Sequence, residues 1–193
     1  MDGIRKMKSK VFICFGLFCL TCCIGLTGYN LYENHRASKN AAAVIRKLSE
    51  TIEDIHIDVT PKQMQTVNIN GYEYIGTLNI SLLNLKTPIL SETTSQLLNV
   101  APCCYSGSFL EDDLVIGGHN YRSLFGKLHH SEIGMEVNFY DVYDKCYTYQ
   151  IAKIEILNPN SIDDLIHSQY DLSIYTCTND GRNRIVVRCL KMN

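Results

Sequence analysis

The sequence lacks the marks of several common protein classes. Its 193 residues show no zinc-finger spacing, no glycine-rich phosphate loop and no internal repeat. It has no excess of basic residues, because 18 Lys and Arg stand against 20 Asp and Glu and the pI is near 6.3. Nothing in this balance predicts a nucleic-acid partner. The length suits one domain with enough chain to bury a core.

Charge is also absent from the stretch VFICFGLFCLTCCIGLTGYNLY, Val11 to Tyr32. As a helix rising about 1.5 Å per residue, it can cross a hydrocarbon layer roughly 30 Å thick. Four basic residues and one acidic residue precede it within residues 1–10. Because basic flanks stay on the cytoplasmic side, we expect a cytoplasmic N-terminus at 1–10, a membrane anchor at 11–32 and the rest of the chain on the extracellular face.

A cleaved signal peptide and a lipoprotein signal are the alternatives to an anchor. No alanine occurs before Ala37, so an A-x-A cleavage site is missing. The LTCC run resembles a lipoprotein box only in part, since Cys22 rather than a small residue precedes Cys23. The uncleaved anchor is therefore the favoured interpretation.

Nine cysteines are present, and four of them lie inside the apolar run, where they are small apolar residues. The other five lie outside it. An odd number leaves at least one thiol unpaired within a monomer, in a compartment where disulfides are permitted. A free thiol there is a sign of function. Cys103 and Cys104 are adjacent, and because a disulfide between neighbours is strained, we expect them to be free or packed.

Apolar residues recur at helical spacing between Ala37 and Ile55. This helix is either a stalk or a helix packed on the domain, and the pattern does not distinguish the two. An extended connector with a breaker at Pro61 follows, so residues 33–68 form the predicted stalk and linker. Residues 69–193 form the predicted folded domain.

From Gly71 onward the pattern is mostly β-strand, with short helices expected at Glu92–Asn99 and Ile162–His167. Strand-forming runs are YEYIGTLNI, LNLKTPIL, the end of SFLEDDLVIGG, two runs around a turn near Tyr143–Lys145, DLSIYTC and RIVVRCL. Many short strands with few helices predict a mainly β fold, a barrel or a sandwich.

The last two strands separate two cysteines. If TNDGRN, Thr178 to Asn183, closes a hairpin, then Cys177 lies opposite Arg184 on one face. The same register places Cys189 opposite Leu172 on the apolar face. We therefore expect Cys189 to be a core residue and Cys177 to stand at a strand end beside a guanidinium.

That pairing has a chemical meaning. A cation near a cysteine favours the thiolate, which is the nucleophile, and an arginine can hold a carbonyl or a developing oxyanion. A nucleophilic cysteine also needs a proton donor for the leaving amine, usually histidine. Of the six histidines, His119 follows LVIGG directly, and two glycines at a strand end allow a turn that brings the next side chain to a rim. His129 and His130 are assigned to a loop or helix.

The motifs LVIGGHNYRSLFGKL, IYTCT and NRIVVRC, in this order and spacing, resemble the sortase family of Gram-positive cell surfaces. The resemblance covers roughly Gly71 to Leu190 and includes the opening strands. It implies a closed β-barrel of about eight strands with short helices on its connections.

The resemblance also implies roles for single residues. Cys177 matches the nucleophile, His119 the general acid and base, and Arg184 the arginine that binds substrate and stabilises the oxyanion. Thr176 and Asn120 match positions near the substrate groove. Arg182 and Arg188 are the alternatives to Arg184 for its role, and where they do not fill it they are expected to be solvated surface charges.

The implied activity is that of a cysteine transpeptidase. It would cleave an LPXTG-like C-terminal sorting signal of a surface protein through a thioacyl enzyme, and transfer the protein to a peptidoglycan amine. No cofactor is implied. Acidic residues at 111–113 and 163–164 could hold calcium, but solvated acidic loops are the favoured interpretation. Because no second apolar span follows and no lid segment is visible between Ile57 and Tyr72, we expect a class other than the pilin-polymerising one.

Three alternatives stay open. An L,D-transpeptidase would carry a Ser-His-Gly-Cys run, which the sequence lacks. A non-catalytic anchored β-domain that binds surface or wall partners would not bring His119, Cys177 and Arg184 together. A weak relative that only binds sorting signals has no support in the sequence, since all three matched positions are filled.

Overall fold

The structure is a computed structural model that describes residues 2–53 and 63–192. The chain divides into two compact units, residues 1–36 and 37–193, and each is described by itself. Ile55 and Pro61, which belong to the predicted helix end and connector, lie outside the described residues. The four-part division of the chain predicted from the sequence stays a prediction.

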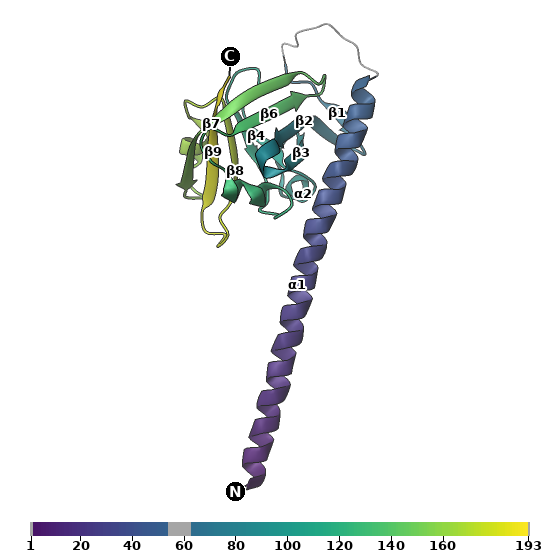
Figure 1. The fold of residues 1–193 in the computed structure, drawn as a ribbon, viewed down its shortest axis with the longest axis vertical. Helices are drawn as coiled ribbons and strands as arrows, with labels where there is room; N and C mark the ends of the chain where they lie inside the picture. The colour runs from purple at the N-terminus through teal and green to yellow at the C-terminus, as the bar shows by residue number, and fades with distance from the viewer. Residues whose placement is uncertain (1, 54–62, 193) are drawn as a thin grey trace. The chain divides into compact units, whose positions relative to one another are not determined.

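The first unit is helical. It holds most of helix α1 (Asp2–Glu53), drawn in purple in Figure 1. By length and composition, α1 is the one helix in the described ranges that could cross a membrane. Its apolar side chains in this unit, such as Phe12 and Leu20, are exposed, which suits a lipid surround.

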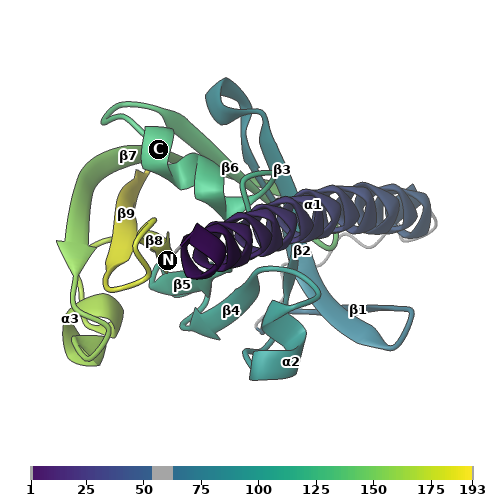
Figure 2. The ribbon, with the colours of Figure 1, turned by 90° about the horizontal axis from the view of Figure 1, so that it is seen from below.

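The second unit is a β-barrel with short helices on its connections (Figures 1 and 2). Its elements after α1 are β1 (Val67–Ile69), β2 (Tyr72–Ile80), η1 (Ser81–Leu83), β3 (Leu85–Leu90), α2 (Ser95–Leu98), β4 (Cys103–Ser106), β5 (Leu114–Gly117), η2 (Phe125–His130), β6 (Glu136–Asp141), β7 (Cys146–Leu157), α3 (Ile162–Ile166), β8 (Leu172–Cys177) and β9 (Arg184–Lys191). Seven of the strands, the turn between β6 and β7, and both short helices lie where the sequence predicts them, although α2 is shorter than expected. The sequence did not predict β1, which begins in the predicted linker, or β4.

The sheet closes on itself. Its order is β1-β2-β3-β4-β5-β8-β9-β7-β6, and a further pairing joins β6 to β2. Eight of the nine strands therefore form the ring, with β1 added at its edge, which confirms the predicted barrel of about eight strands. Gly76 lies at the seam between β2 and β6, where a Cβ would collide with the carbonyl oxygen of Tyr140 and where φ is +154°.

The barrel interior is the main core. Alternate residues of each strand point inward, as Ile116, Ile174 and Val187 do from three neighbouring strands, and all three are inaccessible to solvent. Cys189 lies in this core, as predicted. Burial raises the pKa of its thiol far above the ordinary range, so the thiol stays protonated.

The part of α1 that belongs to the second unit packs on the barrel. Leu48 is 2% exposed and lies in a cluster with Tyr74, Leu90 and Cys103. The sequence left two interpretations open for this helix, a free stalk and a helix packed on the domain. The buried Leu48 favours the packed helix.

Candidate active site

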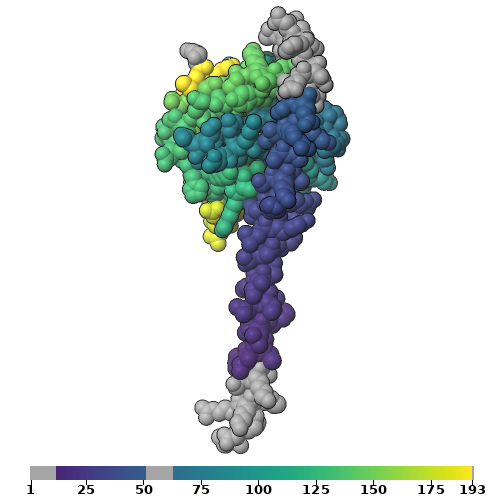
Figure 3. Space-filling view, turned by 45° about the vertical axis from the view of Figure 1, so that its right-hand side comes forward, coloured from purple at the N-terminus to yellow at the C-terminus, as the bar shows by residue number. Residues whose placement is uncertain are grey.

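The hairpin between β8 and β9 brings Cys177 and Arg184 together. The two residues are direct partners in the antiparallel register, and Leu172 pairs with Cys189 at the other end of β8. The loop is closed by hydrogen bonds between Thr178 and Asn183, with the Thr178 N–H donating to the Asn183 carbonyl oxygen at 2.8 Å. The predicted register is confirmed. Figures 1 and 3 show this loop projecting at the end of the barrel opposite the C-terminus.

The face that carries Cys177 points out of the barrel. Cys177 is exposed, and Arg184 is half-buried with its guanidinium over the ring of Tyr175 at 5.1 Å. Tyr175 is in turn met edge-on by Tyr105, with ring centroids 5.6 Å apart. Burial raises the pKa of Tyr175 to about 12, so its ring carries no charge beside Arg184 at neutral pH. The aromatic pair thus supports the guanidinium next to the thiol.

The end of β5 brings His119 to the same rim. β5 runs parallel to β8, Gly117 pairs with Tyr175, and the Gly118 N–H donates to the Tyr175 carbonyl oxygen at 3.2 Å. Two residues beyond this pair, Cys177 ends β8 and His119 follows the end of β5. His119 is exposed, and its ring lies 5.6 Å from that of Tyr121.

The two glycines before His119 are needed for space rather than for a turn. Neither has a positive φ. A Cβ on Gly117 would lie 2.5 Å from the ring of Tyr175, and one on Gly118 would lie 2.6 Å from the ring of Phe125. The sequence argument that the glycines allow a backbone turn is therefore wrong, although the position it predicts for His119 is the one observed.

Thr176 and Asn120, the residues matched to the substrate groove, form hydrogen bonds that stabilise this rim. Thr176 is buried on the inner side, as its parity predicts, and its hydroxyl donates to the Gly118 carbonyl oxygen at 2.8 Å. This bond ties β8 to the strand end that carries His119. Asn120 donates from its amide to the Asn179 side chain at 3.3 Å, which links the connection after β5 to the hairpin loop.

His129 is a residue that sequence reasoning missed. It lies on η2, and its Nε2 is 3.3 Å from the carbonyl oxygen of Cys177. Forty-eight residues separate the two positions, and no motif in the sequence links them. His129 also lines a polar cleft of about 760 Å³ that includes Asn120 and Asn179.

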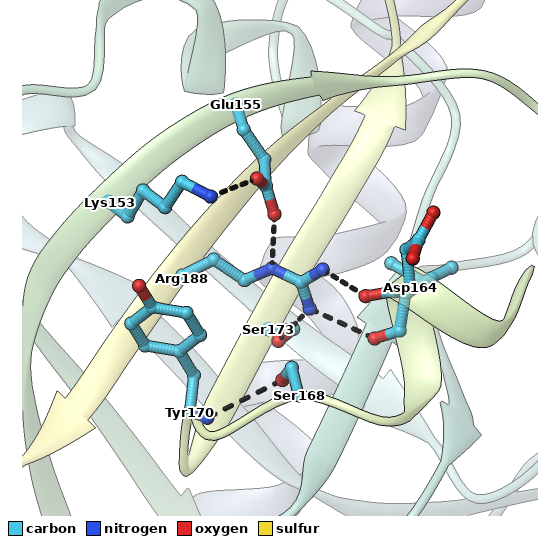
Figure 4. Close-up of polar contacts among 8 residues, drawn as sticks. Lys153, Glu155, Asp164, Ser168, Tyr170, Ser173 and Arg188 are labelled. Atoms are coloured by element: carbon cyan, nitrogen blue, oxygen red, sulfur yellow. Dashed lines mark hydrogen bonds and ion pairs between the residues drawn. The ribbon is translucent and has the colours of Figure 1, made fainter. Parts of the chain in front are cut away.

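Arg188 is not the solvated charge that the sequence predicts. It is 1% exposed, and its guanidinium makes four hydrogen bonds (Figure 4): to Glu155 at 2.9 Å, the Ser173 hydroxyl at 2.8 Å, and the backbone carbonyls of Leu165 at 2.9 Å and Asp164 at 2.5 Å. The carbonyls belong to α3, so Arg188 ties this helix to β8 and β9. Arg182, in contrast, is exposed as predicted.

The other thiols outside the apolar run differ from Cys177. Cys103 and Cys104 are free and buried, which confirms the expectation for this pair, and burial raises their pKa values to about 12 and about 11. Cys146 is exposed but lies at the start of β7, where it contacts Asn138. Of the five thiols, only Cys177 is exposed and paired across a hairpin with an arginine.

Among residues 2–53 and 63–192, no group of three or more His, Cys, Asp or Glu side chains lies close enough to hold a metal ion. Asp112 of the acidic stretch forms an ion pair with Lys191, and Asp113 accepts the Ser108 N–H at 2.7 Å. These carboxylates have protein partners of their own. The expected lack of a cofactor stays a prediction.

A comparison with protein families matches residues 78–192 to the sortase domain. The match covers more than half of the chain and contains β5, β8 and β9 with their strand ends. The chain belongs to the sortase family. The family consists of cysteine transpeptidases, and the resemblance seen in the sequence motifs is confirmed.

Solved sortase structures share the fold. Sortase C of Streptococcus pneumoniae is 18% identical, with a TM-score of 0.63, and the match covers 78% of this chain and 97% of that one. A sortase D5 transpeptidase of Clostridium perfringens is 19% identical, with a TM-score of 0.60 over 81% and 98%. C. perfringens sortase C, solved with the C-terminal cell wall sorting motif, is 18% identical, with a TM-score of 0.56 over 86% and 97%. No curated protein matches this sortase by sequence.

One expectation, a class other than the pilin-polymerising one, is not supported by these matches. The structural matches include sortase C structures, and the work on the S. pneumoniae enzyme concerns pilin substrate specificity. At 18–19% identity the matches establish the fold alone, so they give no ground for that exclusion.

Proposed function

We propose that this sortase is a membrane-anchored cysteine transpeptidase in which Cys177 is the nucleophile, His119 the general acid and base, and Arg184 the oxyanion-stabilising residue. The carrying observation is the meeting of three strand ends at one rim of the barrel. Cys177 and Arg184 are hairpin partners, and His119 lies two residues beyond the end of β5, which runs parallel to β8. The three side chains come from positions up to 65 residues apart, and the pairings of β5 with β8 and of β8 with β9 bring them to one rim.

The first step would transfer an acyl group to the enzyme. The Cys177 sulfur attacks the carbonyl carbon of a Thr-Gly type bond in an LPXTG-like sorting signal, and a C–S bond forms as the C–N bond breaks. The departing amine takes its proton from His119. Arg184 donates N–H groups to the carbonyl oxygen as its charge develops, and Tyr175 and the strand pairing hold the guanidinium in place.

The second step would release the product. A wall amine attacks the thioester carbonyl, a new amide C–N bond forms, and the C–S bond breaks to return the electron pair to the Cys177 sulfur. His119 accepts the proton of the amine. Water in place of the amine gives hydrolysis. Thr176 and Asn120 support this proposal as groups that fix the strand end and the hairpin loop around the reacting carbonyl.

The partners follow from the anchor and the fold. The apolar helix supports a single-pass topology with the basic N-terminus inside and the barrel on the extracellular face. Surface proteins with a C-terminal sorting signal would supply the acyl group, in line with the sorting motif present in the C. perfringens sortase C structure. A peptidoglycan precursor would supply the amine.

A non-catalytic binding domain is the competing function. It predicts that His119, Cys177 and Arg184 have no reason to meet, whereas neighbouring strand ends carry all three. The shared rim therefore supports the enzyme. Membership of the sortase family supports it as well.

The test uses the full chain in detergent micelles with quenched sorting-signal peptides and a panel of amines that includes glycine, alanine, diamino acid and lysine acceptors. We expect amine-dependent transfer by the wild type and none by Cys177→Ala. Cys146→Ala is the matched control, because it removes an exposed thiol at the start of β7 and should keep full activity. Equal loss in both variants, or no turnover and no thioacyl adduct in the wild type, would refute the proposal.

A further inference from the structure

A polar cleft near Cys177 is lined by basic side chains that have no role in the reaction proposed above. It has a volume of about 760 Å³ and is lined by Arg122, Lys127, His129 and His130 together with small and amide residues. One of its lining residues contacts the backbone of the proposed nucleophile, because His129 Nε2 lies 3.3 Å from the carbonyl oxygen of Cys177. The cleft therefore adjoins the strand end that carries Cys177.

The lining of this cleft is cationic. Two of its side chains, Arg122 and Lys127, carry a permanent charge, two are histidines, and none is Asp or Glu. Lys127 is held in place by the carbonyl oxygen of Asn84. Asp180, on the hairpin loop beside the cleft, accepts hydrogen bonds from the Thr178 hydroxyl and a backbone N–H and is not among the lining residues. An anion in the cleft would meet two permanent cations and two histidines, and no carboxylate is among the side chains that line it.

We propose that this cationic cleft binds an anionic group of the amine acceptor, a carboxylate or a phosphate located near the attacking amine. The inference rests on the proposed transpeptidase function and deepens it. A sorting signal of the LPXTG kind is largely apolar and gains little from four basic side chains. An acceptor that brings an anion gains charge-assisted hydrogen bonds, and Arg122 has the planar fork that suits carboxylates and phosphates.

The chemical step is the one described above. The acceptor nitrogen attacks the thioester carbonyl, the C–S bond breaks, and His119 takes the amine proton. The residues of the cleft touch the anion of the acceptor and none of the reacting atoms. Their loss should raise the KM for the acceptor and leave acylation of Cys177 and hydrolysis by water unchanged.

The experiment uses the full chain in micelles and the amine that serves best in the transfer assay. That amine is offered in three peptides of equal length that end in a neutral amide, a free carboxylate, or a phosphoserine amide. We expect the KM of at least one anionic acceptor to be about fivefold lower than the KM of the amide acceptor. This is the effect that one partly exposed charge-assisted hydrogen bond has on binding.

A preference for phosphate indicates a lipid-linked precursor as the source, and a preference for carboxylate indicates a wall peptide.

Two variants and a control locate the effect. Arg122→Gln and His130→Gln change exposed side chains of the cleft and should remove or reduce the preference while hydrolysis stays within about twofold of wild type. Arg182→Gln removes an exposed cation of the hairpin loop that does not line the cleft, and it should keep the preference. Salt at 1 M should weaken the preference in the wild type, since ions screen exposed charges.

The outcomes separate the two proposals. Normal transfer with equal KM values for the three acceptors, or with equal losses of the preference in Arg122→Gln and Arg182→Gln, would overturn the cleft proposal alone. Hydrolysis without transfer to any acceptor would overturn the transfer step of the proposed function together with the cleft proposal. Absence of both hydrolysis and a Cys177 adduct would overturn the transpeptidase and the cleft together.

Discussion

Replacing Arg188 with methionine should destabilise the barrel strongly, although Arg188 is outside the proposed catalytic group. The substitution keeps much of the apolar stem and removes the charge. It leaves the carboxylate of Glu155 without its 2.9 Å partner and removes donors from the Ser173 hydroxyl and two carbonyls of α3 (Figure 4). Loss of α3 would also expose Val115 and Val186, which pack against Leu165.

The magnitude follows from burial and partners. Removing one member of a buried ion pair costs about 3–5 kcal/mol, because a buried charge loses its compensation. Glu155 is 20% exposed and keeps its ion pair with Lys153, so the lower end applies. We expect a loss of about 3 kcal/mol in the free energy of unfolding. Arg188→Lys should recover less than half of this loss, since an ammonium cannot reach all four acceptors.

The assay is urea unfolding of the full chain in micelles, followed by tyrosine fluorescence and by labelling of the buried Cys189 thiol. The double variant Arg188→Met with Glu155→Leu is the matched control, because removing both charges should restore at least 1 kcal/mol of the loss. A cost below about 1 kcal/mol for Arg188→Met, or no recovery in the double variant, would refute the view that the guanidinium is a buried, paired charge.

Three further outcomes test the rim and the core. Thr176→Val removes the hydroxyl that binds the Gly118 carbonyl oxygen, and it should lower the free energy of unfolding by about 1–2 kcal/mol and slow transpeptidation of a quenched sorting peptide, whereas Thr176→Ser should retain most of both. In the folded protein a thiol reagent should label Cys146 within minutes and Cys189 only after urea is added; rapid labelling of both, read by mass spectrometry, contradicts the burial described. Burial raises the pKa of Cys104 from an ordinary value near 9 to about 11, so the unfolded chain loses this proton first and stability should fall by on the order of 2 kcal/mol between pH 9 and 11. Cys104→Ala should reduce the fall of the urea midpoint across that pH range without abolishing it, because burial also raises the pKa values of Cys103 and Cys189, and an unchanged slope would contradict the cause given.

Local patterns of the sequence predicted the long apolar helix, most of the strands and the relation between Cys177 and Arg184. The apolar run needs only a count of residues, because a helix has a fixed rise. The pairing of Cys177 with Arg184 can be predicted from strand parity and a turn sequence alone, because side chains alternate along a strand and the loop fixes the register. These features depend on residues close together in the chain, so the sequence alone was enough to predict them.

Features that depend on distant neighbours were decided by the tertiary structure. The sequence cannot show that α3 packs over Arg188 and accepts its hydrogen bonds. For this reason Arg188 was predicted to be a solvated surface charge. The same holds for His129 beside Cys177, and for the rings of Tyr175 and Phe125 that require glycine at 117 and 118. Burial and close contact are properties of the packed barrel, and they arise only when segments that are separate in the sequence pack together.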